Sequence, residues 1–261
     1  MRALSSALLA LILVVAGGEA LAQITDINMA INKAGRQRML SQRMARAYFQ
    51  IGMQVDTENS KRILDSSVAT FDRQLVELKN FAPTPEIRST YQKLETAWLA
   101  YKDVLLGSAP SQENGRKVLA ISDEVLAIAH QGTVQLEKLS GTTSGRLVNA
   151  SGLVRMRSQR MAKFYQAIAW GVADDRSAAN LAAARKDFIE ALQELTKTPV
   201  NTQQIKESLE LVAQQWMFFE HALNQKGSGD SKRQSLAVAT TSERILEEIE
   251  ITIGLYEKMQ K

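Results

Sequence analysis

The sequence contains no cysteine, only four prolines and only two histidines among its 261 residues. The absence of cysteine excludes disulfide-stapled scaffolds, thiolate nucleophiles and zinc–thiolate centres. The two histidines, His130 and His221, lie far apart in the sequence and belong to no group with metal-ligand spacing. We therefore expect no metal site, no cofactor and no enzymatic activity, and we expect both histidines to be packing or surface residues.

Strand-like alternation is also missing, while Ala, Leu, Gln, Glu, Lys and Arg, which all favour helices, dominate the chain. Breaks marked by Gly, Pro, Asp and Thr recur along the sequence and divide it into eight segments. The pattern predicts an all-α protein made of tandem up-down four-helix bundles. The expected helices cover residues 24–55, 58–81, 84–107, 112–139, 143–171, 175–197, 201–224 and 231–259, and the stretch 141–145 is either a loop or a bend in a longer helix.

Residues 1–22 have the features of a cleaved signal peptide rather than of the folded protein. Arg2 provides the positive start, residues 7–16 form a short apolar core, and Ala20-Leu21-Ala22 is a small-residue cleavage signal. We expect cleavage after Ala22 and a periplasmic location, which also suits a long chain without disulfides. The alternative is an uncleaved membrane anchor, although the apolar run is short for one.

A fifteen-residue phrase occurs twice in the chain, 117 residues apart. Residues 32–46 read NKAGRQRMLSQRMAR and residues 149–163 read NASGLVRMRSQRMAK, with nine identical positions. Fainter matches follow at the same offset, such as Phe71 with Phe188. The repetition predicts two copies of one structural unit, over residues 23–140 and 141–261, with the two copies packed as an internal pseudo-dimer.

Each copy of the phrase places one arginine on an otherwise apolar, small-residue face of its helix. Arg38 follows Ala34 and precedes Ser41, while Arg155 follows Ser151 and precedes Ser158. A guanidinium on a packed face needs a partner, and neither phrase contains an acidic residue.

Two interpretations of these arginines follow from the residues alone. In the first, the two helices face each other and a small planar oxyanion lies between the two arginines. In the second, both arginines pair with carboxylates of other helices, with Asp72, Glu77, Glu124 and Glu137 as candidates. We also expect Arg43 and Arg160 to form structural ion pairs, and we expect the methionines of the phrases and the three tryptophans to be core or interface residues.

Ile31 to Gly35, followed by Arg38-Met39, Ser41 and Arg43, resembles the P-box of bacterial nitrate/nitrite sensor kinases. The same phrase resembles the PilJ-type domain, the N-terminal domain of type IV pili methyl-accepting chemotaxis transducers. In the sensor kinases the motif lies on the first helix of a periplasmic four-helix bundle, and one nitrate binds between two first helices. The resemblance therefore implies ligand contacts from Gly35, Arg38, Gly152 and Arg155, and a nitrate- or nitrite-like anion as the ligand.

The leading hypothesis is therefore a periplasmic sensory module for a small oxyanion that works with a membrane-bound signalling partner. The alternative is a protein-interaction module, associated with a pilus or receptor, in which the arginines are structural. Nucleic-acid binding is not expected of an exported protein whose basic residues lie partly on a buried face. The residues leave open the identity of the anion and whether two chains associate.

Overall fold

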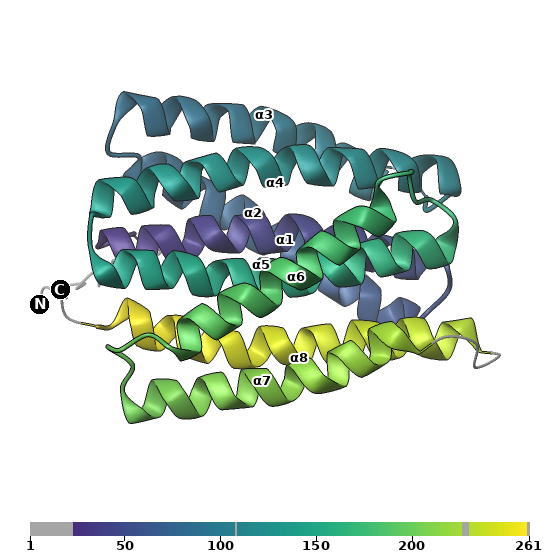
Figure 1. Cartoon of the computed structure of the whole chain (residues 1–261). Helices are drawn as coiled ribbons and strands as arrows, with labels where there is room; N and C mark the ends of the chain where they lie inside the picture. Colours follow the sequence, from purple (N-terminus) through teal and green to yellow (C-terminus); the bar gives the residue numbers. More distant parts are fainter. Residues whose placement is uncertain (1–22, 108, 226–229, 260–261) are drawn as a thin grey trace, which may run out of the picture.

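The computed structural model describes residues 23–107, 109–225 and 230–259 and has eight α-helices in that part of the chain (Figure 1). The first four helices are α1 (Ile27–Gly52), α2 (Thr57–Phe81), α3 (Pro85–Gly107) and α4 (Gln112–Ser140). The second four are α5 (Thr143–Trp170), α6 (Ser177–Thr196), α7 (Gln203–Asn224) and α8 (Ser231–Glu257). The predicted all-α fold is confirmed, and the helix boundaries agree with the predicted ones to within a few residues.

Helices α1 and α5 form the centre of the molecule and lie parallel to each other. Asn28 near the start of α1 donates to Ser144 at the start of α5 (3.0 Å), and Phe49 near the end of α1 packs against Trp170 at the end of α5. In each half, the first helix packs against the second and fourth helices, and the third packs against the fourth. Two four-helix bundles therefore lie side by side and share the α1–α5 contact, which is the predicted internal pseudo-dimer (Figure 1).

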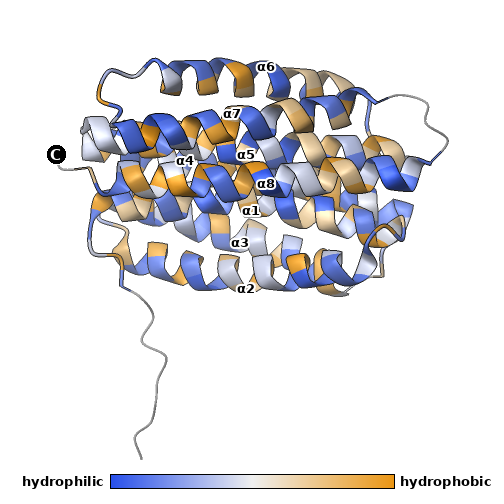
Figure 2. Cartoon of the chain, turned by 90° about the horizontal axis from the view of Figure 1, so that it is seen from below, coloured by the Kyte–Doolittle hydropathy of each residue, from blue (hydrophilic) through white to orange (hydrophobic). Residues whose placement is uncertain are grey.

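The aromatic residues of the two bundle cores are arranged alike. Phe71 of α2 stacks on Trp98 of α3 with ring centroids 4.0 Å apart, and Phe188 of α6 stacks on Trp216 of α7 at 4.6 Å. The visible helices carry both hydrophilic and hydrophobic residues along their length (Figure 2), as expected when one face of a helix enters a core. The same sequence signals thus produce the same packing twice.

Trp170 joins the two bundles at one end of the central pair. Its ring occupies the space beside two glycines of the other bundle: a Cβ on Gly52 would lie 2.1 Å from Trp170 Cζ2, and a Cβ on Gly115 would lie 2.6 Å from Cζ3. A larger residue at either position would overlap the indole unless Trp170 moved. The prediction that Trp170 is an interface residue is confirmed.

The other predicted core residues also have the expected positions. Met39, Met44, Met156 and Met161 are buried, and so is Trp98. The predicted signal peptide and its cleavage site, residues 1–22, lie outside the described residues. Among the described helices, none is both long and apolar enough to span a membrane.

Candidate functional site

The two copies of the repeated phrase meet at their glycines. Asp26 caps the start of α1 by accepting from the main-chain nitrogen of Met29, and Thr142 caps α5 by accepting from that of Gly145, so both phrases lie within regular helices. A Cβ added to Gly152 would lie 4.0 Å from the Cα of Gly35. The two helix backbones therefore lie close together at a point where neither carries a side chain.

The side chains of Arg38 and Arg155 enter the space that these glycines leave. A Cβ on Gly35 would lie 3.1 Å from Arg38 Nη2 and 3.3 Å from Arg155 Nη2. Both guanidinium groups therefore lie beside one point, and both side chains are fully buried. The four residues predicted for the site, Gly35, Arg38, Gly152 and Arg155, are brought together by the α1–α5 contact.

Each arginine donates to the asparagine of the opposite helix. Arg38 Nη2 donates to Asn149 Oδ1 (2.7 Å), and Arg155 donates to Asn32 Oδ1 through Nη1 (3.1 Å) and to its carbonyl oxygen through Nη2 (3.0 Å). Asn32 and Asn149 are the first residues of the two copies of the phrase. The exchange between helices is therefore nearly symmetric.

The asparagines are in turn held by carboxylates from the fourth helix of each half. Asn32 Nδ2 donates to Glu257 of α8 (2.5 Å), and Asn149 Nδ2 donates to Glu137 of α4. These two acids orient the asparagine amides so that each amide oxygen faces an arginine. Glu137, one of the carboxylates proposed for Arg38 or Arg155, thus does not contact Arg38, although it lies near enough for its negative charge to raise the pKa of Arg38.

The symmetry ends at the second partner of each arginine. Arg155 Nη1 donates to Glu250 of α8 at 2.7 Å, whereas Arg38 Nη1 lies 3.2 Å from His130 Nδ1 of α4. Among the described residues, Arg38 has no carboxylate within ion-pair distance. One buried guanidinium is therefore neutralised by an ion pair and the other is bound only by neutral groups.

His130 and Glu250 occupy equivalent positions in the two halves. Gln42 of α1 donates to the carbonyl oxygen of Ser122 in α4, and Gln159 of α5 donates to that of Ser242 in α8, both at 3.0 Å. These contacts relate α4 to α8 by an offset of 120 residues, which also relates Glu137 to Glu257 and His130 to Glu250. The offset differs from the 117 residues that relate α1 to α5.

The carboxylates proposed as direct partners of Arg38 or Arg155 are used elsewhere. Asp72 accepts from Trp98 and Lys102, Glu77 pairs with Lys33, and Glu124 is exposed. The interpretation that the arginines pair with carboxylates is correct for Arg155, although the partner is Glu250, which was not among the candidates. The same interpretation is wrong for Arg38. His130 was predicted to be a packing or surface residue; it is exposed, but the prediction missed its contact with Arg38.

Burial and the adjacent positive charges act directly on Arg38. Loss of hydration, followed by the charges of Arg155 and Arg157, lowers the pKa of Arg38 from its ordinary 12.5 to about 9. Burial also lowers the pKa of Arg155, but the carboxylate of Glu250 opposes that shift. The Nε atoms of both arginines are buried and have no hydrogen-bond partner in the described part of the chain. The site therefore combines an arginine that contacts no described carboxylate with spare N–H donors.

Four other basic residues of the phrases form ion pairs that cross between the halves. Arg43 and Arg46 of α1 pair with Glu243 of α8, and Arg160 and Lys163 of α5 pair with Asp123 of α4. The prediction of structural ion pairs for Arg43 and Arg160 is confirmed. Because each pair joins a first helix to the fourth helix of the other half, these contacts stabilise the α1–α5 arrangement.

Comparison with protein families gives one match, found twice in the chain. The family described as PilJ, type IV pili methyl-accepting chemotaxis transducer N-term, matches residues 20–122 and again residues 140–242. The second match begins next to α5, so each match contains one copy of the phrase. No curated protein matches the chain, and no solved structure does.

Proposed function

Because this chain belongs to the PilJ family, whose domains are periplasmic sensory parts of chemotaxis transducers, we propose that it is a sensory module for a small oxyanion. The ligand we propose is nitrate or nitrite, bound between the first helices of the two halves. Gly35, Arg38, Gly152 and Arg155 form the site. The family is a sensory one rather than a catalytic one.

The observation that carries this proposal is the unpaired charge of Arg38. Its side chain is fully buried, the buried Arg155 lies beside it, and no described carboxylate contacts it. A buried charge that contacts no carboxylate is destabilising. A monovalent anion at the two guanidinium groups would remove that destabilisation, and a trigonal oxyanion matches the planar donor geometry of arginine.

The asymmetry of the site suggests how the anion would be held. Arg155 already contacts the carboxylate of Glu250, which it shares with Arg36, so only part of its charge is balanced. Arg38 would supply the principal positive charge, while Arg155 would contribute N–H donors. Tyr91 lies near enough for Arg38 to affect its pKa, and its buried hydroxyl has no partner among the described residues. The same part of the molecule thus offers a further donor.

The size of the ligand limits its affinity. A four-atom anion binds with at most about −6 kcal/mol, at roughly 1.5 kcal/mol per atom, which corresponds to a Kd of tens of micromolar. That range suits a sensor that must release its ligand when the concentration falls.

Titration calorimetry and thermal melting test the proposal. Nitrate and nitrite should release heat and raise the melting temperature through mass action, and chloride and sulfate at the same ionic strength should do so much less. Arg38→Ala should abolish the response. Arg155→Ala should weaken it, because both arginines contribute donors.

A matched control is available in the same helix. Arg43 carries the same charge one turn away but is held by Glu243, so Arg43→Gln should leave the nitrate response intact. No heat and no melting shift with nitrate at millimolar concentrations would contradict the proposal, provided that the protein is folded. A response that survives Arg38→Ala would place the anion elsewhere.

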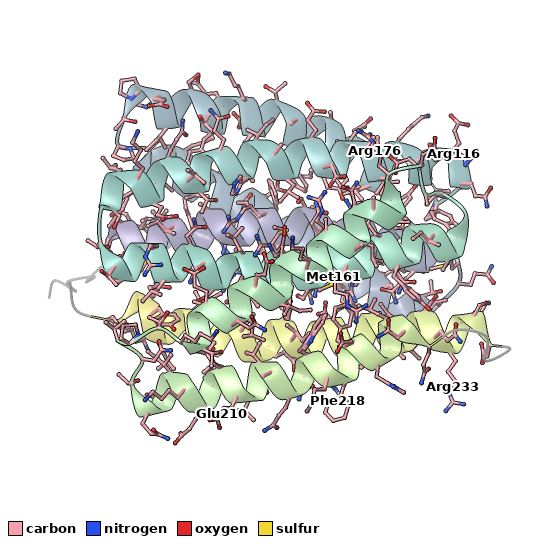
Figure 3. The ribbon with its side chains drawn as sticks, in the orientation of Figure 1. Arg116, Met161, Arg176, Glu210, Phe218 and Arg233 are labelled. Carbon is pink, nitrogen blue, oxygen red and sulfur yellow. The ribbon has the colours of Figure 1, made fainter. Side chains whose placement is uncertain are left out.

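The alternative, a protein-interaction module, has one observation in its favour. Met217 and Phe218 of α7 are more than half exposed, and Leu211 lies on the same helix with 43% of its surface accessible. Phe218 projects from α7 away from the neighbouring helix (Figure 3). A periplasmic partner that binds Phe218 without added anion, and is lost on Phe218→Ser, would favour this function.

The cellular setting that we propose follows from the family. The module would act in the periplasm after cleavage at Ala22 and would pass its signal to a membrane-bound partner. Fractionation of cells, with N-terminal sequencing of the mature chain, tests both the location and the cleavage site. A chain that starts at Met1 in the membrane fraction would overturn them.

A further inference from the structure

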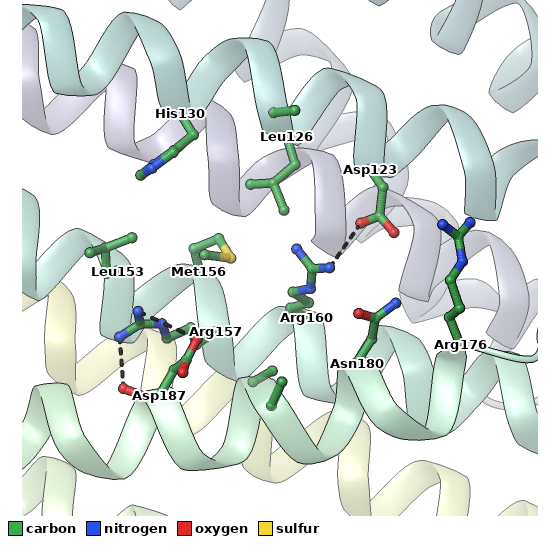
Figure 4. A pocket seen from close by; sticks show the side chains of 13 residues that line it. Asp123, Leu126, His130, Leu153, Met156, Arg157, Arg160, Arg176, Asn180 and Asp187 are labelled. Atoms are coloured by element: carbon green, nitrogen blue, oxygen red, sulfur yellow. Dashed lines mark hydrogen bonds and ion pairs between the residues drawn. The ribbon is translucent and has the colours of Figure 1, made fainter.

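A pocket of about 580 Å³ lies between α4, α5 and α6, on the outer side of the Arg38–His130 contact (Figure 4). Its volume is within the range typical of sites for small organic molecules. We call it the α4–α5–α6 pocket; His130 comes from α4, Arg157 and Arg160 from α5, and Asn180 from α6. It is separate from the fully buried point where Arg38 and Arg155 meet.

The lining of the pocket has a charged part and an apolar part. Arg157, Arg160 and Arg176 contribute three positive charges, against the two carboxylates of Asp123 and Asp187. Leu126 of α4 and Leu153 and Met156 of α5 provide an apolar wall beside them (Figure 4). A ligand that fits both parts has an anionic end and a hydrocarbon body.

The two arginines of α5 are only loosely paired. Arg160 Nη2 lies 3.7 Å from Asp123 Oδ1, and that same oxygen already accepts from Lys163 at 2.8 Å. Among the described residues Arg160 has no hydrogen bond, although its guanidinium lies 5.2 Å from the ring of Phe164. It therefore retains donors that face the pocket.

Arg157 also keeps capacity for a ligand. Its Nη1 donates to the carbonyl oxygen of Asp187 (2.7 Å), but Nη2 is 3.7 Å from the Asp187 carboxylate. Only 19% of the Arg157 side chain and 25% of the Arg160 side chain are exposed. Charge-assisted hydrogen bonds from such sheltered arginines are stronger than those from freely hydrated ones.

The equivalent place in the other half of the molecule has different residues. The counterpart of Arg157 is Leu40, which is buried. The counterpart of Arg160 is Arg43, whose Nε donates to both oxygens of Glu243 at 3.0 and 3.2 Å. One half thus has a hydrophobic residue and a saturated arginine where the other has two arginines with spare donors.

We propose that the α4–α5–α6 pocket binds a small organic monocarboxylate. The carboxylate contacts Arg157 and Arg160, which lie three residues apart and so on one face of α5. The hydrocarbon part lies against Leu126, Leu153 and Met156. The pocket is thereby a second ligand site, independent of the site between Arg38 and Arg155.

Titration calorimetry of the whole mature chain tests this site with hexanoate and benzoate as probes, and with hexanol and benzyl alcohol as their neutral counterparts. Both carboxylates should bind and the alcohols should not. Arg157→Leu, which installs the residue found in the other half, and Arg160→Gln should each weaken binding about tenfold, as expected for one lost charge-assisted hydrogen bond.

Two controls make the outcome decisive. Lys186→Gln removes a positive charge from the exposed side of α6, outside the pocket, and should leave carboxylate binding unchanged. Arg43→Gln, which changes the counterpart of Arg160 in the other half, should also leave it unchanged. If Arg157→Leu does not fold, as judged by circular dichroism, Arg160→Gln decides the question.

Three results would overturn the inference. The first is no binding of either carboxylate at about 10 mM, a concentration at which even weak ligands shift the melting temperature. The second is equal binding of the alcohols or of inorganic phosphate, because the pocket would then not select organic acids. The third is carboxylate binding that disappears with Arg38→Ala but survives both α5 substitutions, because the probes would then occupy the buried site.

Discussion

The two halves of the central site share one geometry but differ in charge balance. Around Arg155, Glu250 supplies a carboxylate at 2.7 Å; around Arg38, His130 supplies a neutral ring nitrogen at 3.2 Å. The helices, the glycines and the paired asparagines are otherwise alike. The difference shows that the two arginines of a duplicated unit can differ in role. Arg155 forms an ion pair within the structure, whereas Arg38 contacts no carboxylate among the described residues.

The largest effect is expected from removing the carboxylate of the balanced half. Glu250→Ala leaves Arg155 and Arg36 without their acid, so the free energy of unfolding should fall by about 3 kcal/mol, because a buried charge loses its partner. Urea denaturation measures this change. Glu247→Ala removes an exposed acid one turn away and should be nearly neutral; equal losses for the two variants would show that the Glu250 contact is not stabilising.

A smaller loss is expected from the equivalent change in the other half. His130→Ala removes one neutral acceptor from Arg38, and water can reach the exposed position. We expect the free energy of unfolding to fall by about 1 kcal/mol. A loss as large as that of Glu250→Ala would mean that the His130 contact stabilises the protein as much as the Glu250 contact does. The proposed difference between the two halves would then be wrong.

A carboxylate at position 130 would make the surroundings of Arg38 like those of Arg155, and we expect it to raise the stability of the protein and to prevent nitrate binding. His130→Glu gives Arg38 a carboxylate at the place where Arg155 has one, so we expect about 0.5 kcal/mol of added stability, the gain typical of a partly exposed ion pair. The same substitution should abolish the nitrate response, because the new carboxylate would pair with the guanidinium of Arg38 in place of the anion. His130→Gln, which keeps a neutral acceptor, is the matched control and should retain the response.

The smallest effect is a dependence of stability on pH. Reduced hydration and the charges of Arg38 and Arg157 lower the pKa of His130 below its ordinary 6.5, so the unfolded chain binds a proton more readily than the folded one. Stability should therefore fall as the pH drops below 6.5, and His130→Gln should reduce that fall between pH 7 and 5.5. An identical pH profile in the variant would show that His130 does not titrate next to Arg38.

The repeated phrase allowed the centre of the molecule to be predicted. Nine identical residues at one offset imply two equivalent helices, and small residues around Arg38 and Arg155 imply close packing. The juxtaposition of the two arginines follows from those two facts. The phrase lies on α1 and α5 only, so it contains no information about which residues of other helices face it.

His130 and Glu250 were missed for a specific physical reason. The connections before the fourth helices differ in length, so α4 and α8 are related by 120 residues while α1 and α5 are related by 117. At an offset of 117, His130 aligns with Glu247, which is exposed and has no contact with an arginine among the described residues. A comparison of α4 with α8 by their own pattern, with Leu126 aligned to Leu246, would have revealed the correspondence.

The short connection between the halves keeps the two parts of the site together at any protein concentration. Gly141 ends α4 in the left-handed conformation and Thr142 caps α5 directly afterwards, so the two halves are joined by a two-residue turn. A site formed by two separate chains would dissociate at low protein concentration, whereas here the partner half is always present at a high effective concentration. Arg38 and Arg155 therefore stay together in a single molecule, however scarce the protein is.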